Sequence, residues 1–132
     1  MIIGDATTGQ HAGMGIGRTK TGISEKGDNV YKLSFFVPED NRDAVKQALF
    51  DIGVGRIGNY DSCCWQALGT GQFRPLEGSD PHIGAQGEVE MLPEWKVEMV
   101  CADDLIHQAV ATLKQAHPYE EVAYDVWQLA DI

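Results

Sequence analysis

Hydrophobic and polar residues alternate with two different periods after residue 29, which predicts a domain containing both strands and helices. Tyr31 to Val37 alternates with the period of a strand. Pro38-Glu39-Asp40 then offers a helix start with acidic residues in the first turn. One face of this helix carries Val45, Ala48, Leu49 and Ile52. Gly53 is expected to end it.

The remaining pattern predicts three more strands and one more helix. A second strand is expected over residues 59–68, followed by a long loop rich in glycine and proline to residue 87. Residues 88–102 alternate again as a strand, and residues 103–116 form a helix opened by two carboxylates. The last strand is expected over residues 122–129. The buried stripe of the second helix is Ile106, Ala109, Val110 and Leu113.

This order predicts an α+β, ferredoxin-like βαββαβ sandwich, with an antiparallel sheet covered on one face by two helices. The other face of such a sheet has no helix to cover it. Trp65, Trp95 and Trp127 are available to that face, and self-association would bury it. We therefore expect a homo-oligomer.

The chain is expected to divide into a tail and one domain. Residues 1–29 have many glycines and threonines and no sustained hydrophobic period, which predicts a flexible N-terminal tail. Residues 30–132 hold enough apolar side chains for a single modest core.

The charge and the cysteine content limit which classes of ligand and which cellular compartment are expected. The formal net charge is −10, and the whole acidic excess lies in residues 30–132. Such a body repels phosphate backbones and anionic lipid, so neither nucleic acid nor a membrane surface is expected as a ligand. The three cysteines form no disulfide or zinc-finger pattern, and no secretory signal or membrane-spanning segment is recognised. A cytoplasmic protein with reduced thiols is the expectation.

The stretch Ala116 to Asp125 holds the densest cluster of ionisable and aromatic side chains. His117 precedes Pro118, which disfavours helical dihedrals at the residue before it, so the helix should end here. A histidine beside Glu120, Glu121 and a phenol could bind a metal or shuttle a proton. In the alternative interpretation His117 caps the helix, the tyrosine packs on the core and the glutamates face water. The residues alone leave both open.

Three separated pieces resemble one known family: Gly58 to Cys64, Gly69 to Gly84, and His117 to Asp125. They are similar to the inserted domain of the NGG-interacting factor three-like proteins, often called GTP cyclohydrolase type 2 homologues. The His-Pro-Tyr-Glu piece also resembles the CutA divalent-cation-tolerance proteins, which share the ferredoxin-like fold with the PII proteins and form trimers. The resemblance implies this CutA/PII-like fold, a trimer and a surface cleft.

The resemblance does not extend to the metal site of the family. Full-length members carry a dinuclear metal site on the two halves that flank the insert, including a His-x-x-His pair. The four histidines here form no such pair, so neither that metal centre nor its proposed hydrolase activity is carried over.

We expect a non-catalytic, oligomeric binding or regulatory module with a small-molecule or protein ligand and no assigned catalytic residue. A first alternative is divalent metal binding or tolerance, with copper or zinc held by His117 and Glu120. A second is a small hydrolase acting on a nucleotide-like substrate, with His117 as base and Tyr60 or Tyr119 as donor. The cleft candidates are Tyr60, Asp61, Cys63, His82, His117, Tyr119, Glu120, Glu121, Tyr124 and Asp125.

Overall fold

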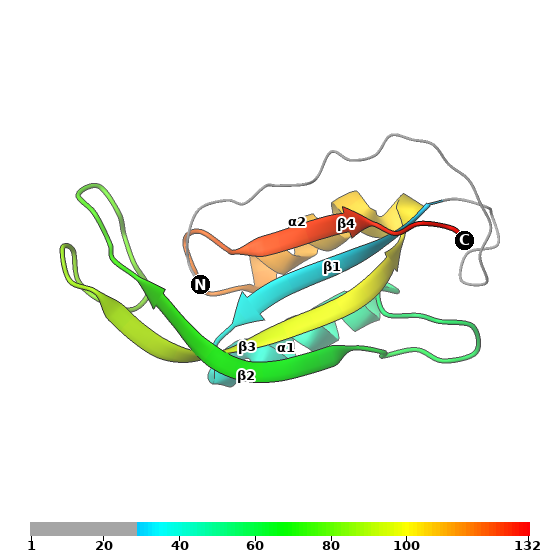
Figure 1. Cartoon of the computed structure of the whole chain (residues 1–132), viewed down its shortest axis with the longest axis horizontal. Helices are drawn as coiled ribbons and strands as arrows, with labels where there is room; N and C mark the ends of the chain where they lie inside the picture. The colour runs from blue at the N-terminus through cyan, green and yellow to red at the C-terminus, as the bar shows by residue number, and fades with distance from the viewer. Residues whose placement is uncertain (1–28) are drawn as a thin grey trace.

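The computed structural model describes residues 29–132, which form one antiparallel sheet with two helices on one face (Figure 1). The strands are β1 (Val30–Val37), β2 (Trp65–Phe73), β3 (Glu90–Ala102) and β4 (Tyr124–Gln128), in the spatial order β2-β3-β1-β4. The helices are α1 (Glu39–Asp51) and α2 (Ile106–Ala116), and a short 3₁₀ turn, η2 (Asp103–Leu105), precedes α2. The predicted ferredoxin-like fold is confirmed. The predicted tail lies almost wholly outside the described residues.

The core lies between the sheet and the helices, as the strand and helix periods of the hydrophobic pattern require. Leu33, Phe35 and Val37 point from the central strand β1 toward the helices and are fully buried. Val45 and Leu49 of α1 and Ala109 and Leu113 of α2 meet them. The predicted apolar helix stripes therefore form one face of the core.

The second strand lies later in the chain than the sequence predicted. Residues 59–64 form no regular strand, with an isolated Ile57–Tyr60 bridge and Ser62 at a φ of 57°, and β2 runs from Trp65 to Phe73. The predicted strand is therefore confirmed over residues 65–68 and wrong over residues 59–64, and the predicted loop is wrong over residues 69–73. Gly69 and Gly71 look like loop residues, yet they pair with Glu94 and Leu92 of β3.

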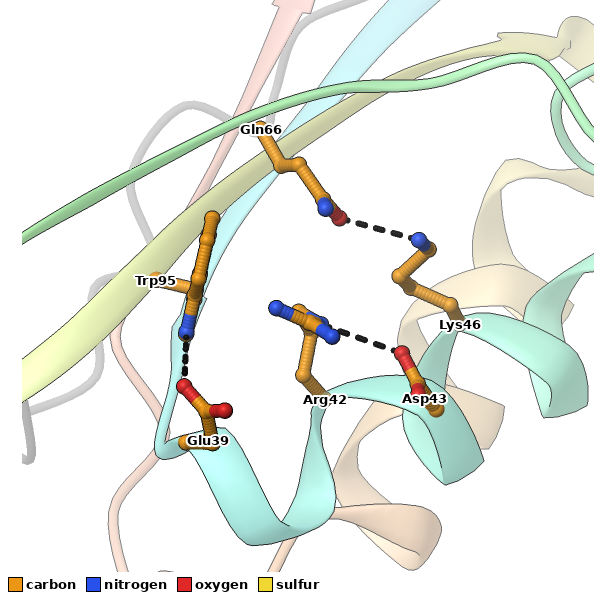
Figure 2. Close-up of polar contacts among 6 residues, drawn as sticks. All are labelled: Glu39, Arg42, Asp43, Lys46, Gln66 and Trp95. Atoms are coloured by element: carbon orange, nitrogen blue, oxygen red, sulfur yellow. Dashed lines mark hydrogen bonds and ion pairs between the residues drawn. The ribbon is translucent and has the colours of Figure 1, made fainter.

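Trp95 lies on the helix face of the sheet, so its prediction as part of the uncovered face was wrong. Its indole Nε1 donates to Glu39 Oε1 at 2.9 Å, and the Arg42 guanidinium lies 4.4 Å from its ring centroid (Figure 2). Lys46 Nζ also donates to Gln66 Oε1 of β2 at 2.9 Å. These contacts fasten α1 to β2 and β3.

Beyond the start of α1, β2 and β3 continue as a curved two-stranded arm (Figure 1). The loop of residues 74–89 joins the two strands at the end of the arm, on the same side of the molecule as the loop of residues 117–123. The fold therefore brings these two loops to one end of the sheet.

Neither helix in the described part of the chain has the length and apolar character to cross a bilayer.

Candidate functional site

His117 ends α2 as predicted, and its side chain is a structural link to β1. The residue is extended, with a ψ of 141°, and its backbone N–H donates to Leu113 O at 3.0 Å. Its ring Nε2 lies 2.6 Å from Phe36 O, and Nδ1 accepts the backbone N–H of Tyr119 at 3.2 Å. A carbonyl only accepts and an amide only donates, so these partners fix the neutral tautomer with the proton on Nε2.

Burial holds the imidazole neutral. His117 is 6% exposed, and desolvation lowers its pKa from the ordinary 6.5 to about 4. With one ring nitrogen donating and the other accepting, the neutral ring has no free lone pair for a metal or for a substrate proton. The prediction that the His117 side chain caps the last carbonyls of α2 was wrong, because the ring bonds to β1 and to the Tyr119 amide instead.

Tyr119 connects His117 to the arm. Its ring centroid lies 4.7 Å from that of His117 and 6.1 Å from that of His82. The side chain is buried, and its hydroxyl lies beside the Glu94 carboxylate without a regular hydrogen bond to any described residue. Burial and the charge of Glu94 raise the pKa of Tyr119. The phenol therefore stays protonated at neutral pH and can donate a hydrogen bond.

The long loop of residues 74–89 is held against the loop of residues 117–123. The backbone N–H of Asp80 donates to Glu120 Oε1 at 3.0 Å, across 40 positions of sequence. Within the loop, Ser79 Oγ donates to Leu76 O and Gln86 Nε2 donates to Ser79 O. This bonding places the exposed His82 near Tyr119.

A groove of about 270 Å³ opens beside this cluster, on the face of the sheet away from α1 and α2. Ala67, Gly69 and Gly71 of β2 and Phe36 of β1 give it an apolar lining. Glu94 and Lys96, two residues apart on β3, also line it. Glu94 is only 3% exposed, and a side chain at Gly71 would collide with its carboxylate.

Three of the cleft candidates lie at the opposite end of the sheet. Tyr60 and Asp61 are exposed in the loop between α1 and β2, and Cys63 is half-buried. That loop is fixed by Gly55 N donating to Val100 O, near the end of β3, and by Cys63 N donating to Gly55 O. Within one chain the loop between α1 and β2 lies at the other end of the sheet from the loops of residues 74–89 and 117–123 (Figure 1).

The last three cleft candidates lie in three different environments. Tyr124 belongs to the core, and the Lys114 ammonium lies 5.4 Å from its ring centroid. Asp125 is half-buried on the uncovered face of β4, opposite Ser34. Glu121 is exposed, next to the Glu120 that holds Asp80. The structure thus brings together His82, His117, Tyr119 and Glu120.

The two residues proposed for a metal, His117 and Glu120, bond to backbone groups in this structure. His117 uses both ring nitrogens on the backbone, and a Glu120 oxygen accepts the Asp80 amide. No group of three or more histidine, cysteine or acidic side chains among residues 29–132 is arranged to hold a metal ion. Copper or zinc at this position would require His117 to break a buried hydrogen bond.

Sequence reasoning missed Glu94, the buried carboxylate beside Tyr119. A polar residue in an alternating strand is expected to face solvent, so the pattern assigns Glu94 to the surface. The available signal lies on the neighbouring strand, because Gly69-Thr70-Gly71 leaves room for a side chain from β3.

Comparisons by sequence and by structure both find known proteins that are similar to this chain. No family model matches the chain. A protein of Halalkalibacterium halodurans named GTP cyclohydrolase 1 type 2 homolog is 43% identical over 104 residues, 79% of this chain and 28% of the relative. A Bacillus cereus protein related to NIF3 superposes with a TM-score of 0.69 at 38% identity, over 79% of this chain and 26% of that one.

The CutA protein of Synechococcus elongatus has a TM-score of 0.57 at 16% identity, over 76% of this chain and 77% of that one. This likeness shows a shared fold only. The chain spans about a quarter of the length of the curated relatives that it matches. Its relationship is therefore to one segment of those proteins.

Proposed function

We propose that this chain, which is homologous to a segment of the NIF3-related proteins, is a non-catalytic module that assembles as a trimer and binds a ligand at its surface. The ligand would occupy a cleft formed by the groove over β2 and the cluster of His82, Tyr119 and Glu120. The observation that carries the proposal is the Asp80–Glu120 bond, which holds two distant loops beside the buried Glu94.

A binding role fits the chemistry of this cluster better than hydrolysis. A general base needs a lone pair within reach of a substrate proton, and both nitrogens of His117 are bonded to the backbone. Tyr119 has a raised pKa, so it acts as a donor at neutral pH. Donors and acceptors fixed in this way suit recognition.

Assembly as a trimer follows the CutA resemblance and has support in the exposed surface. The uncovered face of the sheet carries Trp65, 58% exposed, and Trp127, 47% exposed. β2 is also an edge strand with an unpaired side. A neighbouring subunit would cover these groups, and it could bring Tyr60, Asp61 and Cys63 to the cleft.

A cytoplasmic location is part of the same proposal. Cys63, Cys64 and Cys101 are all free thiols, which suits a reducing compartment.

Sedimentation velocity on the unmutated protein tests the assembly. We expect a trimer, and we expect Trp65→Ser to shift the protein toward monomer because it removes exposed apolar surface from the uncovered face. Leu76→Ser is the matched control, since Leu76 is similarly exposed but lies in the loop of residues 74–89. A protein that sediments as a monomer at every concentration would refute the proposed assembly.

A further inference from the structure

The groove on the uncovered face has opposite charges at two neighbouring positions of one strand. Glu94 and Lys96 both line it and are two residues apart on β3, so their Cα atoms are roughly 6 to 7 Å apart. Between and beside them lie Phe36, Ala67 and Gly69. The groove therefore combines an acceptor, a cation and an apolar wall.

The two charges differ in how tightly they are held. The Glu94 side chain is buried beside the Tyr119 hydroxyl and Gly71, so its carboxylate has a fixed position. The Lys96 side chain is 41% exposed, and its Nζ lies 3.3 Å from Glu98 Oε2. The Glu98 side chain is 21% exposed, and an ion pair at a partly exposed surface contributes about 1 kcal/mol, so Lys96 can turn toward a ligand at modest cost.

The floor of the groove has space that a ligand could fill. A Cβ atom added at Gly69 would meet no atom within 4 Å, in contrast to one added at Gly71. A volume of about 270 Å³ suits a molecule of amino-acid size better than a nucleotide. The protein's net charge of −10 also disfavours a phosphate-bearing ligand.

We propose that this groove binds a small zwitterion of the amino-acid class, with its ammonium on Glu94, its carboxylate on Lys96 and its apolar side chain over Gly69 against Phe36. The inference rests on the proposed function, because it names the ligand class of that cleft. A ligand carrying both charges would form two charge-assisted hydrogen bonds, whereas an amine or an acid alone would form one.

Three matched probes test this charge requirement by isothermal titration calorimetry on the full chain. They are L-leucine, 3-methylbutylamine, which lacks the carboxylate, and 4-methylpentanoate, which lacks the ammonium. We expect leucine to bind about tenfold or more tighter than either half-ligand. Equal affinity for all three, or no heat with any of them, would overturn the proposal.

Two variants test whether Glu94 binds the ammonium of the ligand and Lys96 its carboxylate. Glu94→Gln should abolish leucine binding, and Lys96→Met should reduce leucine to the affinity of the amine. Glu98→Gln is the control, because it removes a carboxylate from the same strand and frees Lys96 from its ion pair. It should bind leucine as well as or better than the unmutated protein. Retention of full affinity by Lys96→Met would contradict the zwitterion assignment.

A third variant remains informative if Glu94→Gln does not fold. Gly69→Val places its Cβ in open space, with no atom within 4 Å, and favours the strand, so the protein should stay folded and lose leucine binding. Gln72→Val, at an exposed position of β2 outside the groove lining, should keep it. Sedimentation of the same samples separates the two proposals: a trimer that ignores leucine refutes the ligand class alone, and a monomer refutes the assembly.

Discussion

His117 shows how one buried side chain can join three parts of the fold. Its ring bridges Phe36 of β1 and the backbone of Tyr119, and its own amide closes the last turn of α2. The bond from the Tyr119 N–H needs the neutral ring, because a second ring proton on Nδ1 would face that N–H instead of accepting from it, whereas Phe36 O can accept from either form. Protonation and folding are therefore coupled at this residue.

We predict that acid weakens the fold through His117. The folded-state pKa of about 4 lies below the ordinary 6.5, so between these values the unfolded chain binds a proton that the folded chain does not. This contribution is fully present above pH 6.5 and is lost as the pH falls toward 4. Between pH 7 and pH 5 the free energy of unfolding should fall by about 2 kcal/mol on this account.

Urea denaturation at pH 7 and pH 5 measures the effect. His117→Asn should be less stable than the unmutated protein at pH 7 and should lose less stability on going to pH 5. His107→Asn, an exposed position on α2, is the control and should keep the pH dependence of the unmutated protein. If His117→Asn and the unmutated protein lose the same stability, His117 is not the titrating group.

Among the elements, the two loops at the end of the arm depend on each other. The loop of residues 74–89 contains no helix or strand. Its described links to the loop of residues 117–123 are the Asp80–Glu120 bond and the ring contact between His82 and Tyr119. Long loops without such links open readily, so this bond should control how often the loop leaves the groove.

We predict that Glu120→Ala loosens the long loop while leaving the core intact. Amide hydrogen exchange around Asp80 should become faster, because its backbone N–H loses its acceptor. Glu121→Ala is the adjacent control, since Glu121 is also exposed and makes no described contact with that amide. Equal protection of Asp80 in both variants would show that the bond does not hold the loop in solution.

Sequence patterns predicted elements well where periodicity and backbone chemistry agree. Pro118 placed the end of α2 at Ala116, and the apolar stripes placed the faces of both helices. The start of β2 was misplaced because neither face of residues 59–68 is plainly apolar, and the glycines that follow read as a loop. The burial of Glu94 was not predicted, because alternation along one strand cannot distinguish a carboxylate that faces solvent from one that is covered by a segment far away in the sequence.

Among residues 29–132, one large surface of the sheet is not covered by any helix or loop. Trp65 and Trp127 stay exposed on the sheet face opposite the helices, and the groove opens on that same face. A second subunit would change both the exposure of these rings and the set of residues around the groove. The number of subunits is therefore the property on which the functional account depends most.

Native mass spectrometry on protein made without added metal tests this most directly, because one spectrum gives both the subunit number and any bound mass. We predict a trimer without stoichiometric copper or zinc. A trimer whose stoichiometric metal disappears in His117→Ala would contradict the metal-free account and favour the cation-binding alternative. A monomer without bound mass would contradict the oligomeric binding module itself.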